Sequence, residues 1–269
     1  MGSSSKGLTD LFDISDRSVL IIGGCGAFGS ASAKALASAG CKLTLADRGK
    51  QKLNKVSTEI KALGGEVTTI NIWPDTESNA ETIIRSAVNN YGTLDLMLVT
   101  LGTNSVAHIE GQNFNDWRNV MTANLDYYWL ACQAAGRQFA KQTKSKNRNK
   151  IVVMSSTRGR HGLPNGYSSY CASKSGLDGM VRALACEWGS KGININAIGP
   201  TVFPSSLSDW MFSDKEPGKS ARERMLDRVP IGRLSSTDDL IGGLIYLLSS
   251  ASDYVTGQTI YIDGGYTAN

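Results

Sequence analysis

A tyrosine and a lysine stand four residues apart in the segment Tyr170-Cys171-Ala172-Ser173-Lys174. Apolar residues then recur at spacings of three and four, which predicts a helix with both side chains on one face. A tyrosine hydroxyl titrates near pH ~10, but a nearby ammonium favours the tyrosinate and lowers its pKa. The pair could therefore act as an acid–base group. Tyr167 lacks such a partner, because a cysteine follows it four residues on.

A second set of residues suits nucleotide binding. Glycines follow the first apolar run and precede a helical pattern that ends at Gly40. Read from Gly24, they match G-x-G-x-x-G and end at Gly29. Glycines here allow a tight turn and let backbone N–H groups approach a pyrophosphate at a helix N-terminus. The match predicts a dinucleotide site, since a strand precedes it and a helix follows.

Asp47 ends the next apolar run, 18 residues after Gly29. A carboxylate here accepts hydrogen bonds from the adenosine ribose hydroxyls and repels a 2′-phosphate. We therefore predict NAD as the cofactor rather than NADP. Two features leave alternatives open: Asp47 could be a helix N-cap or a surface acid, and the neighbouring Arg48 could accept a 2′-phosphate.

Seven apolar runs alternate with helical patterns, which is typical of βαβ units. We predict a single α/β domain over residues 1–269: a doubly wound, Rossmann-like parallel sheet of about seven strands. Residues 1–14 are expected to form a flexible N-terminal extension. The polar segment 204–228 is expected to be a lid insertion over the active site. The expected strands are Ser18–Gly24, Lys42–Asp47, Glu66–Ile72, Leu94–Thr100, Lys150–Ser156, Gly192–Ile198 and Thr259–Gly265.

Composition argues against several function classes. A net charge of +4 is too small to indicate nucleic-acid binding, and the basic stretch Lys144–Lys150 is interpreted as a solvated loop. The five cysteines form no C-x-x-C pair, which favours reduced thiols in a cytoplasmic protein. No apolar run approaches the roughly 18 residues of a membrane helix, and no signal peptide is visible. With two histidines and no ligand cluster, we expect no metal site.

Further residues extend the tyrosine–lysine pair into a resemblance. From about Ser15 to the C-terminus, the chain resembles the short-chain dehydrogenase/reductase family in its single-domain form. Ser156 matches the family serine, 14 residues before Tyr170, and Asn124 in MTANLDYYW matches the helical asparagine. Two late segments also match, PIGRLSSTDDL and VTGQTIYIDGG.

The resemblance implies a role for each catalytic residue. Tyr170 would exchange a proton with the substrate oxygen, which Ser156 would polarise. Lys174 would hold the nicotinamide ribose and lower the pKa of Tyr170, and Asn124 would hold a water behind it. A homo-oligomer, commonly a tetramer, is also implied. The expected cofactor contacts are Gly23, Cys25, Gly26, Phe28, Gly29, Asp47, Arg48, Asn71, Ile72, Gly102, Tyr170, Lys174, Pro200, Val202 and Ser205.

The chain departs from the family pattern in its cofactor loops. Ala27 replaces the middle glycine of the family's G-x-x-x-G-x-G, and Asn71 replaces an aspartate that contacts adenine. Val99-Thr100-Leu101-Gly102 stands where the family has Asn-Asn-Ala-Gly. The support of these loops is therefore expected to differ.

The expected substrate residues are Arg158, His161 and Trp210, with Asn165, Tyr167 and Phe212 also in range. Their types favour a polar substrate, either anionic or polyhydroxylated such as a sugar acid. We predict hydride transfer between NAD(H) and a secondary alcohol or ketone. The alternatives are an NADPH-dependent carbonyl reductase of the 3-oxoacyl type and a non-catalytic nucleotide-binding sensor. The partner would be this small molecule, with no nucleic acid and no membrane.

Overall fold

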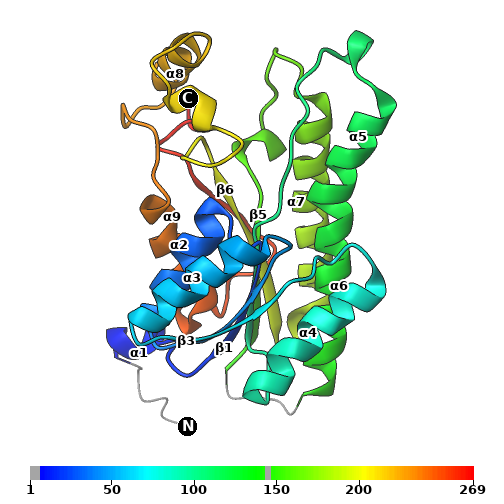
Figure 1. Ribbon diagram of the computed structural model, residues 1–269, viewed down its shortest axis with the longest axis vertical. Coiled ribbons are helices and arrows are strands. Elements are labelled where there is room, and N and C mark those ends of the chain that lie inside the picture. The colour runs from blue at the N-terminus through cyan, green and yellow to red at the C-terminus, as the bar shows by residue number, and fades with distance from the viewer. Residues whose placement is uncertain (1–6, 143–146) are drawn as a thin grey trace.

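The computed structural model describes residues 7–142 and 147–269, and its centre is one parallel sheet (Figure 1). Seven strands lie in the order β3-β2-β1-β4-β5-β6-β7, and every neighbouring pair is parallel. The predicted doubly wound, Rossmann-like α/β fold is confirmed. The strands are β1 (Ser18–Ile22), β2 (Lys42–Ala46), β3 (Glu66–Ile70), β4 (Leu96–Val99), β5 (Asn149–Met154), β6 (Ile193–Pro200) and β7 (Thr259–Ile262).

Continuous apolar runs form the central strands, because both faces of the sheet are covered. All residues of β1, β4 and β6 are buried. The strand order reverses between β1 and β4, so the loops after these strands diverge and leave a crevice at their carboxyl ends. Ligands of such sheets bind at this switch point. The glycine turn and Thr100 follow the two strands that flank it.

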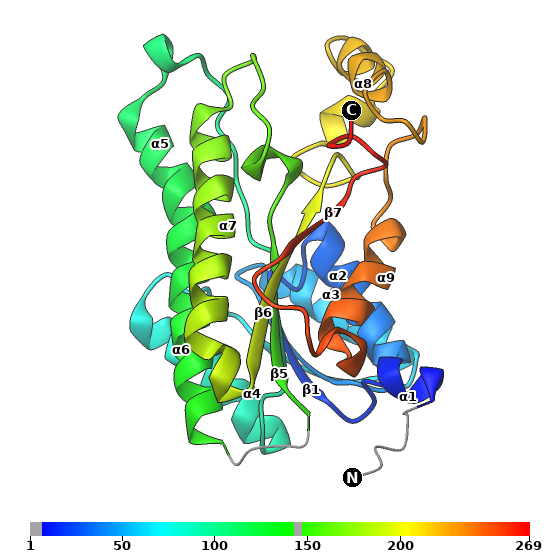
Figure 2. The same ribbon diagram turned by 180° about the vertical axis from the view of Figure 1, so that it is seen from behind.

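Two helical layers cover the sheet, as the opposite views in Figures 1 and 2 show. One core contains side chains of α2, α3 and α9, and the other contains side chains of α4, α6 and α7. Helix α7 carries Tyr170 and Lys174 beside β5 and β6. The helix bounds are α1 (Leu8–Phe12), α2 (Ala27–Ser38), α3 (Lys50–Ala62), α4 (Glu77–Tyr91), α5 (Phe114–Met121), α6 (Tyr127–Lys141), α7 (Ser168–Trp188), α8 (Gly218–Leu226) and α9 (Asp238–Leu248).

Part of the expected N-terminal extension has regular structure. Residues 8–12 form α1, and the backbone oxygen of Leu11 accepts a hydrogen bond from Ser250 Oγ at 3.0 Å. Ile14 is buried against the α2–α9 side of the sheet. This segment therefore packs on the domain through the buried Ile14 and the Ser250 hydrogen bond, whereas Leu8 and Phe12 of α1 are exposed. Residues 1–6 lie outside the described residues.

The interpretation of the basic stretch as a solvated loop is wrong at its carboxyl end. Lys150 is buried in β5, and its Nζ lies 2.8 Å from a carboxylate oxygen of Asp253. Arg148 donates hydrogen bonds to Asn194 and, at 2.7 Å, to the backbone oxygen of Gly189. These cations join β5 to neighbouring segments. Residues 143–146 lie outside the described residues.

The insertion after β6 lies over the carboxyl end of the sheet, as expected of residues 204–228. It contains a short 3₁₀ turn, Asp209–Phe212, and helix α8. In both ribbon views the C-terminus lies beside α8 (Figures 1 and 2). Within the described ranges, no helix is long and apolar enough to cross a membrane.

Candidate active site

The glycine turn between β1 and α2 is closed by its own backbone. Gly23 has a left-handed φ of +89°, and its carbonyl oxygen accepts a hydrogen bond from Gly26 N at 3.1 Å. A Cβ added to Gly29 would lie 2.1 Å from that same oxygen, so only glycine fits. Ala27 is tolerated because it is the first residue of α2 and its φ is not positive.

Thr100 holds the glycine turn in place, at a position where the family pattern has an asparagine. Its Oγ1 donates to the backbone oxygens of Gly23 at 3.1 Å and Ile22 at 3.3 Å. The end of β4 is thereby tied to the glycine turn on β1. Both acceptors are backbone atoms, so a threonine hydroxyl can hold the turn in this protein.

Asp47 lies at the end of β2 and faces the glycine turn. Its carboxylate accepts from Cys25 N at 3.3 Å, Gly49 N at 3.2 Å and Trp73 Nε1 at 3.4 Å. The guanidinium carbon of Arg48 lies 3.6 Å from the centroid of a Trp73 ring. One anionic and one cationic side chain therefore stand together at the end of the crevice where an adenosine ribose would lie.

A cavity of about 750 Å³ runs from the glycine turn to the segment after β6. Its wall includes most of the predicted cofactor residues: Gly23, Cys25, Gly26, Phe28, Gly29, Asp47, Arg48, Gly102, Tyr170, Lys174, Pro200, Val202 and Ser205. Asn71 and Ile72 are not on this wall. Asn71 instead donates to the backbone oxygen of Asp47 at 2.8 Å, and Ile72 packs on the core.

A dinucleotide fits these residues on physical grounds. The turn leaves no room for a Cβ at Gly29, so backbone rather than side chains forms the floor beside the N-terminus of α2. Such a surface suits a pyrophosphate. Asp47 and Lys174 line the two parts of the same cavity that the ends of a dinucleotide would occupy.

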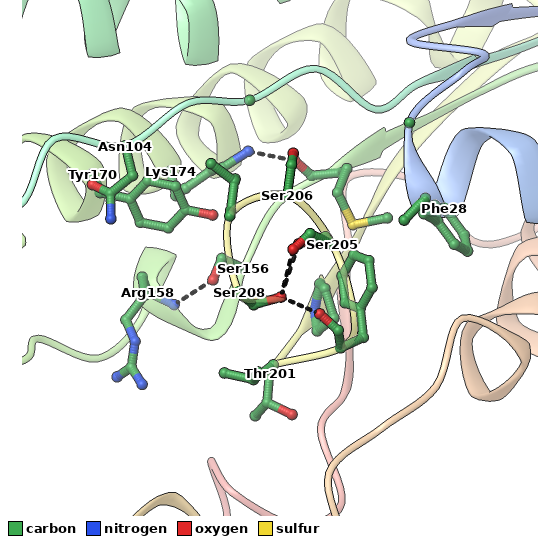
Figure 3. A pocket seen from close by; sticks show the side chains of 18 of the residues that line it. Phe28, Asn104, Ser156, Arg158, Tyr170, Lys174, Thr201, Ser205, Ser206 and Ser208 are labelled. Atoms are coloured by element: carbon green, nitrogen blue, oxygen red, sulfur yellow. Dashed lines mark hydrogen bonds between the residues drawn. The ribbon is translucent and has the colours of Figure 1, made fainter. Parts of the chain in front are cut away.

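The predicted catalytic residues meet at the middle of the cavity. Figure 3 shows the hydroxyl of Tyr170 directed toward Ser156, with Lys174 behind the tyrosine ring. Ser156 Oγ accepts a hydrogen bond from Arg158 N at 3.1 Å, which fixes the serine at the start of the turn Thr157–Gly159. Lys174 Nζ donates to the backbone oxygen of Met154 at 2.7 Å.

The pKa values differ from the expectation that Lys174 lowers the pKa of Tyr170. Burial raises the pKa of Tyr170 to about 12, against the opposing effects of a hydrogen bond with Ser156 and the charge of Arg158. Burial also lowers the pKa of Lys174 to about 7, against the charge of Asp178. Desolvation thus disfavours both charged forms, and the groups that lower the Tyr170 pKa are Ser156 and Arg158.

Asn124 is fully buried behind this group, on the π-helical segment Thr122–Asp126 between α5 and α6. Its side chain pairs with the backbone of Thr103, accepting at 2.8 Å and donating at 3.0 Å. It also donates to Ser173 Oγ at 3.1 Å, next to Lys174. The asparagine therefore positions the loop after β4 against α7; its part in a water relay stays a prediction.

The expected substrate residues divide into two groups. Arg158 and Trp210 line the cavity, as do Asn165 and Tyr167. The placement of His161 and Phe212 on this wall is wrong. The His161 ring packs edge-on against Tyr266 with centroids 6.4 Å apart, because the turn after Ser156 directs it behind the cavity wall.

Several residues of the site were missed by sequence reasoning. Asn104 stands beside Tyr170 (Figure 3), and its buried Oδ1 has no partner among the described residues. Tyr266 and Arg228 line the same cavity from the C-terminal segment and the end of the α8 region. Their residue types could have indicated polar contacts, but nothing in their spacing connects them with Ser156 or Tyr170.

Comparison with known proteins agrees with this geometry. A family model described as enoyl-(acyl carrier protein) reductase matches residues 26–267. An uncharacterized oxidoreductase of Mycobacterium tuberculosis is 42% identical over 258 residues, covering 96% of this chain and 93% of that protein. A 2-dehydro-3-deoxy-D-gluconate 5-dehydrogenase of Dickeya dadantii is 31% identical, covering 97% and 99% of the two chains.

Among solved structures, a gluconate 5-dehydrogenase from Burkholderia cenocepacia, in complex with NADP and tartrate, superposes with a TM-score of 0.89. It is 25% identical and the match covers 98% of this chain and 100% of that one. The family model and the relatives span nearly the whole chain, and the model includes the cavity residues from Gly26 onward. The chain is an oxidoreductase that belongs to the short-chain dehydrogenase/reductase family.

Proposed function

We propose that this protein transfers a hydride between NAD(H) and a secondary alcohol or ketone, on a polar compound such as a sugar acid. The observation that carries the proposal is the convergence of Tyr170 and Ser156 on one wall of the cavity, with Lys174 behind them. The glycine turn lines the same cavity, so one ligand could reach both regions.

The side chains of this protein would handle the proton and orient the reacting oxygen. Ser156 would donate a hydrogen bond to that oxygen, and Tyr170 would take or return its proton. Lys174 would hold the ribose hydroxyls and, when protonated, stabilise the tyrosinate. A bound nicotinamide would supply or accept the hydride. Lys174 is buried and Tyr170 is half-buried on the cavity wall, so their electrostatic interaction is stronger than it would be in water.

Asp47 supports NAD as the preferred cofactor. Its carboxylate is fixed by three donors on the cavity wall, and a 2′-phosphate there would meet a negative charge. Arg48 and Lys52 line the same end and would favour NADP. The ratio of kcat/KM for NAD and NADP tests the balance. We expect Asp47→Ala to lower this ratio, and a parent that prefers NADP would overturn the assignment.

The names of two similar proteins support a sugar acid as the substrate. One relative is named for 2-dehydro-3-deoxy-D-gluconate and one similar structure for gluconate. The second candidate is an NADPH-dependent carbonyl reductase of the 3-oxoacyl type. The matching family model is described as an enoyl thioester reductase, so it supports the acyl-thioester class of substrate and not reduction of a carbonyl. Turnover of sugar acids and of 3-oxoacyl thioesters, each measured with both cofactors, separates the two. The expected homo-oligomer stays a prediction that light scattering can test.

Replacement of Tyr170 by phenylalanine tests the mechanism. General acid–base catalysis contributes about 10²–10⁴-fold, so we expect Tyr170→Phe to lower kcat by about 10³-fold. Binding of NADH, followed by nicotinamide fluorescence, should stay within about threefold, since the ring remains. Tyr254→Phe, at a fully exposed position outside the cavity, serves as the control. A Tyr170→Phe enzyme as active as the parent would contradict the proposal.

A further inference from the structure

The end of the cavity beyond Ser156 carries an excess of positive charge. From the region of α8, Ala221, Arg224, Met225 and Arg228 line the wall at helical spacing, and Arg158 lines it from the turn after β5. Within the described ranges, the one carboxylate on the cavity wall is Asp47, which belongs to the nucleotide end. The arginines therefore face a ligand space without a protein anion.

Arg158 is held firmly but retains free donors. Its side chain is buried, and Nη1 donates to Tyr266 Oη at 3.0 Å and more weakly to the backbone oxygen of Gly162 at 3.4 Å. Nε and Nη2 have no partner in the part of the chain that the structure describes. A buried guanidinium without a counter-charge is costly, so an anion in the cavity would stabilise it.

Arg228 lies near the same tyrosine. Its guanidinium carbon lies 4.5 Å from the Tyr266 ring centroid, and that of Arg158 lies 5.0 Å from it. Neither arginine forms an ion pair among the described residues. Arg228 is exposed, so water partly screens its repulsion of Arg158, and an anion within reach of both guanidinium groups would offset that repulsion further. A hydrogen bond from Arg158 fixes the Tyr266 hydroxyl. Arg158, Arg228 and Tyr266 all line the cavity.

We infer that Arg158, Arg228 and Tyr266 form a subsite for the carboxylate of the substrate. The inference rests on the proposed function, because it assigns the far end of the same substrate. Ser156 precedes Arg158 by two residues, so the anionic group would lie a short distance from the oxygen that Ser156 and Tyr170 hold. A planar guanidinium fork matches a carboxylate, and the subsite selects short hydroxy acids over neutral polyols.

Paired ligands that differ at one end, a carboxylate in one and a neutral hydroxymethyl group in the other, test this subsite. D-gluconate and D-glucitol form one pair, and D-glycerate and glycerol form a second. Each would be titrated calorimetrically into the protein saturated with NADH or, where that binds more tightly, NADPH; an alcohol with a reduced cofactor cannot react. We expect at least one acid to bind about tenfold more tightly than its neutral partner, and Arg228→Gln to reduce that preference about fivefold or more.

Matched variants make the outcome decisive. Arg160→Gln removes an exposed arginine outside the cavity wall and should leave the preference unchanged. Arg158→Met should abolish the preference, and Arg228→Gln keeps the test valid where the buried substitution prevents folding. Equal binding within both pairs, or a preference that persists in Arg228→Gln, would overturn the subsite. D-glucitol 6-phosphate binding more than tenfold tighter than gluconate would also overturn the assignment to a carboxylate.

Turnover separates this subsite from the proposed function. Reduction of NAD or NADP by neutral secondary alcohols, without any preference for acids, would contradict the subsite and leave the reaction intact. A preference for acids that Arg228→Gln removes, without turnover of any alcohol or ketone, would support the subsite and contradict the reaction.

Discussion

The nucleotide end and the substrate end of the cavity are built in different ways. At the glycine turn of the nucleotide end, backbone atoms form the surface: the Gly23 carbonyl closes the turn, and the Thr100 hydroxyl bonds to backbone oxygens. At the substrate end, side chains from three separate segments meet, with the guanidinium groups of Arg158 and Arg228 near the Tyr266 ring. Substitutions in the glycine motif can therefore leave the glycine turn intact. At the substrate end, by contrast, single side chains form the binding surface.

This difference explains why departures from the family pattern have small structural effects. Ala27 and Thr100 replace a glycine and an asparagine, yet the turn keeps its hydrogen bonds because their partners are backbone groups. Two glycines of the turn have no such freedom: Gly23 has a left-handed φ of +89°, and at Gly29 a backbone oxygen occupies the space of a side chain. We therefore expect a new Cβ to weaken NADH binding most at positions such as Gly29, where it has no room, and least at positions such as Gly26, where it nearly fits.

The largest expected effect at the nucleotide end is that of Gly29→Ala. The new Cβ would lie 2.1 Å from the Gly23 oxygen, so the turn must move. Overpacking of this kind costs about 1–3 kcal/mol, and we expect NADH to bind up to about 100-fold more weakly. Gly26→Ala is the control, because its Cβ would lie 3.3 Å from the same oxygen at a φ of −69°.

Nicotinamide fluorescence gives the dissociation constants, and circular dichroism checks that both variants fold. We expect Gly26→Ala to bind NADH within about threefold of the parent, since its neighbour must give way by only a few tenths of an ångström. Equal NADH dissociation constants for Gly29→Ala and Gly26→Ala would show that the glycine turn is not rigid. The nucleotide end would then not differ from the substrate end in the way described above.

A smaller effect is expected for Thr100→Val, which keeps the shape of the side chain and removes its hydroxyl. The hydrogen bonds to the backbone oxygens of Gly23 and Ile22 are lost. A hydrogen bond contributes about 1 kcal/mol, so NADH should bind about fivefold more weakly. Thr44→Val removes a hydroxyl pair with Thr68 elsewhere in the sheet and serves as the control. If Thr100→Val and Thr44→Val bound NADH with equal affinity, the Thr100 hydroxyl would not be what holds the glycine turn for the cofactor.

The fold and the centre of the site could be predicted from sequence because their signals are local. The alternating apolar runs indicate the sheet, and the four-residue spacing of Tyr170 and Lys174 places both on one helix face. Because all strands are parallel, Ser156 and the glycine turn then lie at the carboxyl ends of the strands, on the same side of the sheet. Each step needs only neighbouring residues and the topology of parallel strands.

The remainder could not be predicted because it depends on contacts between distant segments. Tyr266 meets Arg158 across 108 positions of sequence, and no spacing rule connects them. His161 was placed in the cavity from its distance along the chain, but the turn after Ser156 directs its ring toward Tyr266. The pKa values were also beyond reach, since they depend on burial as well as on charge.

The smallest expected effect concerns pH and the carboxylate of Asp178, one turn beyond Lys174 on α7. Because the pKa values of Lys174 and Tyr170 lie at about 7 and about 12, the pair loses its first proton near neutral pH. Alcohol oxidation needs the pair with one proton removed, so its kcat/KM should rise as pH rises through about 7. Ketone reduction needs both protons, so its kcat/KM should fall over the same range.

The charge of Asp178 raises the pKa of Lys174, so Asp178→Asn should move both pH profiles to lower pH. At neutral pH, oxidation should then rise and reduction should fall, each by less than about tenfold, because tenfold corresponds to a full pKa unit. Thr259→Val removes the 2.9 Å hydrogen bond to Asp178 but keeps the charge, and should leave the profiles in place. If the Asp178→Asn profiles moved to higher pH, the account would be contradicted. Such a shift would mean that the Asp178 charge does not raise the pKa of Lys174.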